Sequence, residues 1–276
     1  MKNYLNRVER YLFNEPDPAF ARRAAIIFSG LGKLKTGSRI LDVGCGRGFY
    51  LKVLSDTFPG LKLCGLDLSR EYLTVAEKFI NNGKVELTSG SIEDLPYKNN
   101  SFDSVIASEV LEHVEDDSKA IGEIYRVLKR GGNALITVPN KKYPFLWDPL
   151  NWILERLFNT HIPSNIWWLA GIWADHKRLY TKEELVQKVH KVGLRVDKIW
   201  ETTHYCFPFS HFIFYGIGKN LVETGFFQDF NRFSKSGKLL LLNQLILFPS
   251  RLLDKLNNGL KKYDSSVNIV LKVIKS

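Results

Sequence analysis

Residues 40–54, ILDVGCGRGFYLKVL, hold three glycines at alternate positions between an apolar run and a segment with helical spacing. Glycines in such a loop let the backbone approach a ligand closely. Gly44, Gly46 and Gly48 depart from the dinucleotide fingerprint G-x-G-x-x-G, because the third glycine comes one residue early. Asp42, two residues before the first glycine, would repel a pyrophosphate and attract an ammonium group. The pattern favours S-adenosylmethionine, which is cationic at nitrogen and sulfur, over NAD.

A second acidic residue, Asp67, ends the next apolar run about twenty residues after the glycine loop. In a strand–helix–strand unit that binds a nucleotide, an acidic residue at this place meets the ribose hydroxyls. The loop and Asp67 together therefore predict a cofactor site at the carboxyl ends of parallel strands.

The elements that must position these residues alternate along the chain. Strands are predicted over 39–43, 61–68, 84–89, 102–108, 133–138, 194–204 and 267–275, and helices over 49–58, 70–80 and 116–129. Thr181 and Glu184 form a capping box that starts a further helix, which Gly193 ends. This alternation predicts an α/β fold whose mostly parallel sheet is covered on both faces.

Residues 38–140 closely resemble the class I S-adenosylmethionine-dependent methyltransferases (type 11-like), through LDVGCGRGFYLKVL, CGLDLSREYLTVAEK and SEVLEHV. The resemblance implies a Rossmann-like, seven-stranded sheet with an antiparallel last strand. It also implies contacts with the cofactor. The methionine part would face Asp42, Gly44, Cys45 and Gly46, and the ribose would meet Asp67 and Leu68. Ser91 and Ile92 would lie at the adenine, and Ser108 and Glu109 near the sulfonium. The family often has Asp where this chain has Ser91, so the hydroxyl of Ser91 or the nearby Asp94 would take over that contact.

The stretch SEVLEHV contains Glu109, Glu112 and His113 in an E-x-x-E-H arrangement. Two carboxylates and an imidazole can hold a divalent cation, as in some relatives that methylate quinone precursors or RNA ends. Leu-Glu-His-Val is common in the family without a metal, and no metal is assigned here. His113 is then expected to shape the catalytic pocket.

We expect one methyltransferase domain with an inserted helical cap. Its parts are N-terminal helices (1–37), a cofactor-binding core (38–140), two cap insertions (141–180 and 205–263) and the last strand (264–276). In the first insertion Asp148 and Pro149 start a helix, and four aliphatic residues share one of its faces: Leu150, Ile153, Leu154 and Leu157. The second carries seven basic residues and one acidic residue between 232 and 262.

The insertions have two interpretations, and the sequence leaves both open. They pack as a cap over the sheet, or they form interfacial helices on an anionic membrane, which the net charge of +10 would favour. Nucleic acid is disfavoured as a partner, because the basic residues alternate with aliphatic ones that do not stack on bases.

Proton removal from an acceptor needs a general base, and histidine titrates near neutral pH. His176 and His113 are the candidate catalytic residues, with His161 and His204 as alternatives in the insertions. Arg22, in the N-terminal helices, is a candidate to close over the cofactor.

The chain has three cysteines without metal-ligand spacing, no apolar signal region at its start and no apolar run of roughly 18 to 20 residues. We therefore expect a cytoplasmic protein, with attachment to the inner face of the membrane as an alternative. The predicted function is methyl transfer to a hydrophobic acceptor: a quinone precursor, an isoprenoid or another lipid. A soluble small-molecule acceptor, or a non-catalytic membrane- or partner-binding protein, are the alternatives. The acceptor and the oligomeric state are not predicted.

Overall fold

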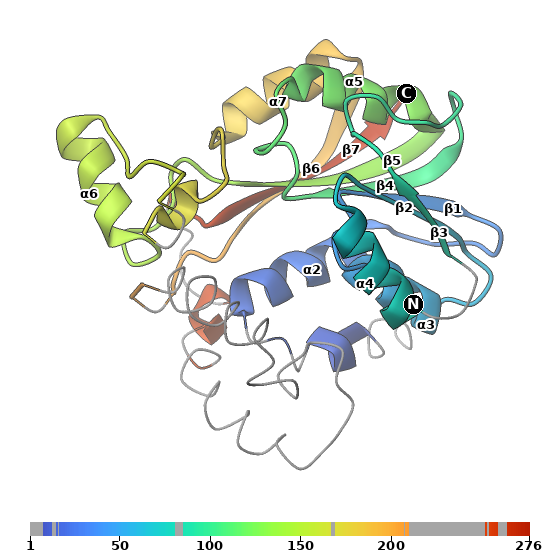
Figure 1. Ribbon diagram of the computed structural model, residues 1–276, viewed down its shortest axis with the longest axis horizontal. Helices are drawn as coiled ribbons and strands as arrows, with labels where there is room; N and C mark the ends of the chain where they lie inside the picture. The colour runs from blue at the N-terminus through green and yellow to red at the C-terminus, as the bar shows by residue number, and fades with distance from the viewer. Residues whose placement is uncertain are drawn as a thin grey trace.

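A seven-stranded sheet in the order β3-β2-β1-β4-β5-β7-β6 runs through the centre of the computed structural model (Figure 1). The structure describes residues 8–12, 15, 17–80, 85–166, 169–206, 208–209, 252, 254–258 and 264–276. The strands are β1 (Arg39–Val43), β2 (Lys62–Asp67), β3 (Val85–Ser89), β4 (Phe102–Ser108), β5 (Leu128–Pro139), β6 (Leu194–Thr202) and β7 (Asn268–Lys275). Strands β1 to β5 pair in parallel, and β7 is antiparallel to both β5 and β6. The predicted sheet with its antiparallel last strand is confirmed.

Helices cover both faces of this sheet. Helices α2 (Pro18–Gly30), α3 (Phe49–Thr57) and α4 (Arg70–Ile80) pack on one face, and α5 (Asp117–Val127) and α7 (Lys182–Lys191) on the other (Figure 1). The central strands β1 and β4 are therefore covered on both sides, and most of their residues are buried without the alternation of a strand that has one exposed face. Their carboxyl ends all point to the edge where the glycine loop lies.

One helix ends earlier than the sequence predicted. The expected helix over 116–129 stops at Val127, and β5 begins at Leu128 with extended backbone angles. Gly131 and Gly132 lie inside this strand rather than ending the helix. A Cβ on Gly132 would lie 2.8 Å from the carbonyl oxygen of Lys129 and 3.0 Å from that of Asp103, so the glycine permits a close approach of chains.

The first insertion packs in a separate apolar cluster that it shares with Ala19, Cys206 and Val267. It contains α6 (Pro149–Phe158) and the 3-10 helix η1 (Gly171–Trp173), and Tyr143, Trp147 and Ile172 are buried within it. Helix α6 lies at one end of the molecule, away from the sheet (Figure 1). Most of the second insertion lies outside the described residues, including the greater part of its basic and apolar run. The 3-10 helix η4 (Lys255–Asn258) is described.

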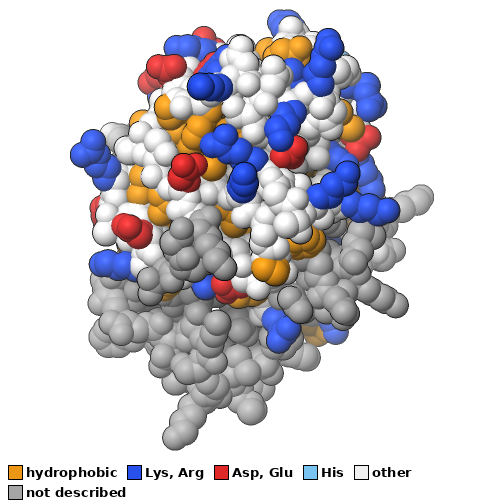
Figure 2. All heavy atoms as spheres, turned by 90° about the vertical axis from the view of Figure 1, so that its right-hand side faces the viewer, with side chains coloured by type: hydrophobic (Ala, Val, Ile, Leu, Met, Phe, Trp, Pro, Cys, Tyr) orange, Lys and Arg blue, Asp and Glu red, His pale blue; other side chains and the backbone are white. Residues whose placement is uncertain are grey.

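The surface at the opposite end from α6 carries many basic side chains. Figure 2 shows Lys and Arg spread over the described part of this face, with fewer acidic side chains and only small apolar patches. Among the described helices, none combines the length and apolarity needed to cross a bilayer.

Candidate active site

The glycine loop between β1 and α3 is open on one side and tightly packed on the other. Gly44, Gly46 and Gly48 adopt φ angles of 64°, 52° and 80°, a region that disfavours other residues. A Cβ on Gly44 would lie 2.3 Å from Cγ2 of Val110, so this loop contacts the loop after β4. A Cβ on Gly46 would meet nothing within 4 Å. The loop therefore leaves room for a ligand at Gly46.

Asp42 is a buried carboxyl group at the carboxyl end of β1. Its side chain is 1% exposed, and its Oδ2 has no hydrogen-bond partner among the described residues. Burial, followed by the charge of Asp67, raises its pKa well above the usual range. An ammonium group would satisfy this oxygen and favour its ionised form. The amino-acid end of S-adenosylmethionine carries such a group, so Asp42 fits the expected cofactor.

Asp67, at the end of β2, fixes the backbone of the glycine loop. Its Oδ2 accepts from the N–H of Gly46 at 2.8 Å, and its Oδ1 accepts from the N–H of Ser69 at 2.8 Å. Each carboxylate oxygen can accept a further hydrogen bond, so ribose hydroxyls can still bind here. Leu68 beside it is 72% exposed, which leaves an apolar surface next to the ribose position.

The other cofactor candidates are less accessible. The Oγ of Ser91 accepts from the N–H of Glu93 at 3.1 Å, so this hydroxyl stabilises the turn after β3. Ile92 is only 4% exposed and belongs to the core. The thiol of Cys45 is also turned inward, and burial raises its pKa. The backbone N–H of Cys45 donates to the carbonyl oxygen of Leu66 at 3.0 Å, and its carbonyl oxygen accepts from the N–H of Gly48 at 2.9 Å, so Cys45 helps to fix the glycine loop.

Glu109 is held at the end of β4 by three other elements. Thr137 of β5 donates to Oε1 at 2.7 Å, and Asn268 of β7 donates to Oε2 at 2.8 Å. The guanidinium of Arg23, from α2, lies 3.3 Å from Oε2, and its side chain is buried. The backbone of Glu109 has a φ of 55°. Both carboxylate oxygens are thus engaged within the protein.

Hydroxyl groups extend this network toward α3. The Oγ of Ser108 lies 3.1 Å from the hydroxyl of Tyr50 and 3.2 Å from Oγ1 of Thr137. Burial raises the pKa of Tyr50 to about 12, so this hydroxyl stays protonated near neutral pH. Sequence patterns gave no signal for Tyr50 or Thr137, because their roles depend on contacts between distant segments. The predicted Arg22 instead bonds to Asp254, and its neighbour Arg23 reaches the site.

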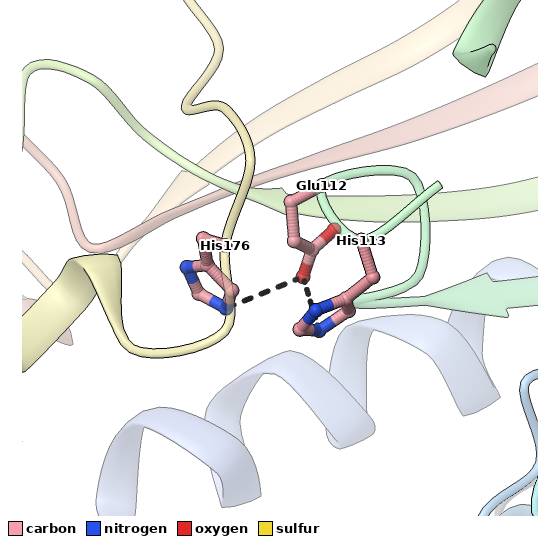
Figure 3. Close-up of side chains that lie close together, drawn as sticks. All are labelled: Glu112, His113 and His176. Atoms are coloured by element: carbon pink, nitrogen blue, oxygen red, sulfur yellow. Dashed lines mark ion pairs between the residues drawn. The ribbon is translucent and has the colours of Figure 1, made fainter. Parts of the chain in front are cut away.

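Glu112, His113 and His176 come together from two distant segments (Figure 3). The loop after β4 supplies Glu112 and His113, and the segment between η1 and α7 supplies His176. Oε1 of Glu112 lies 3.8 Å from Nε2 of His113 and 4.0 Å from Nε2 of His176. One candidate ligand atom from each residue lies within 4.8 Å of the other two. Both histidines are candidates from the sequence, but only the fold brings them to one carboxylate.

The carboxylate of Glu112 is fully buried at the centre of this cluster. Neither oxygen has a hydrogen-bond partner in the described part of the chain. Burial, followed by the charge of Glu109, raises the pKa of Glu112 well above its usual range. Nδ1 of His113 lies 2.9 Å from the carbonyl oxygen of Asp175, which orients that ring. The cluster can therefore accept a proton or a cation at a site of fixed geometry.

The two alternative histidines lie outside this cluster. His161 stacks on Trp173, with 3.9 Å between the ring centroids. His204 is 9% exposed, and its Nδ1 lies close to the carbonyl oxygen of Ser265. These contacts give both rings a packing role in the insertions.

Comparisons with known proteins agree with this geometry. Residues 41–136 match the family model described as "Methyltransferase domain". The chain is 34% identical over 149 residues to phosphoethanolamine N-methyltransferase 2 of Caenorhabditis elegans, covering 53% of this chain and 32% of that protein. It is 29% identical over 174 residues to the mitochondrial ubiquinone biosynthesis O-methyltransferase of Rattus norvegicus, covering 61% of this chain and 47% of that protein. The chain thus spans less than half the length of these two relatives.

The fold is also that of a solved methyltransferase structure. Haemonchus contortus phosphoethanolamine N-methyltransferase 2, in complex with phosphomonomethylethanolamine and S-adenosylhomocysteine, aligns with a TM-score of 0.57 and 21% identity. The alignment covers 92% of this chain and 52% of that one. The family match thus identifies a methyltransferase domain over residues 41–136, and the fold around it is that of this S-adenosylhomocysteine-bound methyltransferase.

Proposed function

We propose that the protein transfers a methyl group from S-adenosylmethionine to a hydrophobic acceptor, such as a quinone precursor, an isoprenoid or another lipid. The observation that carries this proposal is the contact between the glycine loop and the loop after β4, at Gly44 and Val110. Asp42 lies two residues before Gly44 and Glu112 lies two residues after Val110, so this contact joins the two segments that carry these buried carboxyl groups. One loop would bind the methyl donor, and the other would face the acceptor.

The cofactor end of this site would work by orientation. When bound, S-adenosylmethionine supplies a methyl group that its sulfonium already activates for in-line displacement. Asp42 would hold the ammonium group, and Asp67 would hold the ribose while it keeps the N–H of Gly46 in place. Exposed Leu68 would pack against the nucleoside. Correct placement of the donor accounts for much of the rate enhancement that such sites provide.

The acceptor end would remove a proton. His176 and His113 are the proposed bases, because Nε2 of each imidazole lies about 4 Å from the same oxygen of Glu112. An imidazole that takes the proton of an acceptor hydroxyl becomes cationic, and the Glu112 carboxyl would stabilise that charge. Glu112 would thus position and assist the bases rather than contact the acceptor.

A second interpretation of the cluster is a divalent cation site. Glu112, His113 and His176 offer one oxygen and two nitrogen ligands, a set that suits Zn²⁺ or a similar ion with a coordination position left open. The sequence had suggested Glu109 as a ligand, but its carboxylate is engaged by Thr137 and Asn268. A cation here would polarise an acceptor oxygen and so replace the need for a free base.

Features of the first insertion support a hydrophobic acceptor. It connects β5 to α7, brings His176 to the cluster, and exposes large apolar side chains at Leu157 and Phe158. The relative from Rattus norvegicus is named for ubiquinone biosynthesis, which involves a hydrophobic product. Phosphoethanolamine N-methyltransferase, in contrast, is named for a small polar acceptor, so a soluble acceptor is the second candidate.

Methyl-labelled S-adenosylmethionine tests the proposal. Purified protein is incubated with the labelled cofactor and a cell extract, and the lipid, nucleic acid, protein and polar fractions are then counted. Label in the organic phase, lost in Asp67→Ala, is the expected result. Label confined to the polar fraction would contradict a hydrophobic acceptor and favour the second candidate.

Cofactor titration separates catalysis from the non-catalytic alternative. We expect S-adenosylhomocysteine to bind and NADH not to bind. If neither binds, and no fraction takes up label, the protein is a binding protein on a methyltransferase fold.

A further inference from the structure

Three polar side chains of helix α6 and its N-cap, namely Asp148, Asn151 and Glu155, bond to the rest of the insertion. Asp148 and Asn151 are 0% exposed. Oδ2 of Asp148 accepts from Nδ2 of Asn151 at 2.7 Å and from the N–H of Ile172 at 2.9 Å. One turn further along, Glu155 accepts from the hydroxyl of Tyr143 at 3.0 Å. The inner face of this helix is therefore anchored by hydrogen bonds rather than by aliphatic packing.

The outer face of the same helix is apolar. Among the described residues ten large apolar side chains are exposed, and six of them lie between positions 145 and 158. We call these six the α6 ridge: Phe145 (43% exposed), Leu146 (41%), Leu150 (39%), Ile153 (38%), Leu157 (72%) and Phe158 (67%). An ordinary surface helix shows the reverse arrangement, and an apolar patch of this kind marks an interaction site.

The charges around the α6 ridge are basic. Between positions 141 and 166 the acidic residues are Asp148 and Glu155, both engaged on the inner face. Arg156 is exposed on α6 itself, and Lys141 and Lys142 are exposed in the stretch just before Phe145. The face at the other end of the molecule also carries Lys and Arg, but its apolar side chains form only small patches (Figure 2).

We propose that the α6 ridge docks the protein on an anionic lipid surface. Apolar side chains that enter the acyl boundary, bordered by Lys and Arg that meet anionic head groups, are the combination by which interfacial helices bind membranes. A second copy of the chain fits this surface less well. A symmetric contact would bring the same basic side chains of two copies together, in a protein with a net charge of +10.

Docking at this place would deliver a lipid acceptor to the candidate active site, a consequence that rests on the proposed function. The segment that carries the ridge leaves the sheet after β5 and returns at His176, opposite Glu112. Its anchors, Asp148 and Asn151, hold α6 to the rest of the insertion through the N–H of Ile172. The ridge and the acceptor end of the site are thus parts of one ordered segment.

Vesicle sedimentation tests the proposal. The full chain is mixed with vesicles of phosphatidylcholine alone or with phosphatidylglycerol, without cofactor or acceptor. We expect binding to the anionic vesicles, weakened about tenfold by Leu157→Gln combined with Phe158→Ser, because two exposed apolar side chains are lost. Replacing Lys141 and Lys142 by Gln should reduce the preference for anionic lipid.

Matched variants and a second measurement make the outcome decisive. Lys191→Gln and Arg195→Gln, on α7 and β6 and outside both insertions, should leave vesicle binding unchanged. The proposal would be overturned if the controls lost as much vesicle binding as the ridge variant, or if the native chain did not bind vesicles. A concentration-dependent dimer in analytical ultracentrifugation, abolished by the ridge variant, would instead assign the ridge to a second copy.

The labelling assay separates this proposal from the proposed function. If vesicle binding fails while label still enters the organic phase, only docking is wrong. If vesicle binding holds while no fraction takes up label, only the assigned methyl transfer is wrong.

Discussion

At Asp42, both burial and the nearby charge of Asp67 disfavour an ionised carboxylate, although the residue is acidic. A buried carboxyl with an unsatisfied oxygen reduces stability unless a ligand compensates for it. Residues held in such an unfavourable state are typical of binding sites. The environment of Asp42 therefore supports its role at the ammonium group of the cofactor better than its sequence position alone.

Asp42→Asn should weaken the binding of S-adenosylhomocysteine about 10- to 100-fold, because a charge-assisted contact becomes a neutral one. The free energy of unfolding without ligand should stay equal or rise, since the amide carries no buried charge. Isothermal titration and urea unfolding measure the two quantities. Asp197→Asn, at an exposed carboxylate of β6, is the control. Unchanged affinity in Asp42→Asn would show that this carboxyl does not contact the ligand.

Glu112 provides the second test at the residue scale. If its cluster holds a cation, the protein should contain about one divalent ion per chain by elemental analysis, and EDTA should remove both the ion and the methyl transfer. Glu112→Gln should lose the ion, while Glu115→Gln, at an exposed neighbour, should keep it. Added Zn²⁺ should raise the melting temperature of the native protein but not of Glu112→Gln. Full activity in metal-free protein would leave the histidines as bases.

At the scale of elements, the sequence predicted the sheet well because burial on both faces leaves a clear pattern. Strands β1 and β4 cover the residues 39–43 and 102–108 that the sequence predicted. The start of β5 was missed because the residues before Gly131 also have helical spacing, and pairing with β4 decides their conformation. The glycine loop and Asp67 were found in the same way, from local pattern and spacing.

The rest of the site could not be predicted from local pattern. Arg23 reaches Glu109 from the N-terminal helix, and His176 reaches Glu112 across more than sixty residues. Contacts of this kind depend on how the elements pack, and no spacing rule in the chain encodes them. Sequence patterns found these histidines one at a time, whereas the fold brings them to one carboxylate.

Alanine substitutions at two glycines test whether close packing at Asp148 stabilises the first insertion. Gly171 has a φ of 57°, and a Cβ there would lie 2.0 Å from Oδ2 of Asp148, the anchor of α6. Gly122 lies inside α5, where a Cβ would meet nothing within 4 Å. Gly171→Ala should therefore destabilise the protein by about 2 kcal/mol or more, and Gly122→Ala should stabilise it by about 0.5–1 kcal/mol. Urea unfolding measures both, and similar effects of the two changes would contradict this account of the anchor.

At the scale of the whole molecule, Asp117 joins the two segments that form the candidate site. It starts α5, directly after the loop that carries Glu112, and accepts from Lys188 of α7 at 2.7 Å and from the hydroxyl of Tyr180 at 2.8 Å. The same hydroxyl lies 2.9 Å from the carbonyl oxygen of Leu111, so two acceptors share its single proton. Burial alone would raise the pKa of Asp117, but the bonds from Lys188 and Tyr180 outweigh it and lower the pKa.

This lowered pKa predicts how stability depends on pH. The carboxyl of Asp117 binds a proton less readily in the folded protein than in the unfolded chain. The stability that the ionised Asp117 contributes is therefore complete above about pH 4, and it is lost as the pH falls through the lower pKa of the folded state. Asp117→Asn should cost about 1–3 kcal/mol near neutral pH, since it replaces a charged acceptor. The difference between variant and native protein should shrink below about pH 4, where the native carboxyl is also neutral.

Urea unfolding from pH 2.5 to 7 measures this difference directly. Glu115→Gln is the control, because its pair with Lys177 is exposed to solvent and screened, so the urea midpoint should hardly move. If the difference in unfolding free energy between Asp117→Asn and native protein is the same at all pH values, the charge of Asp117 does not stabilise the contact between α5 and α7. A difference that disappears in acid would mean that the charge of Asp117 stabilises the contact between α5 and α7.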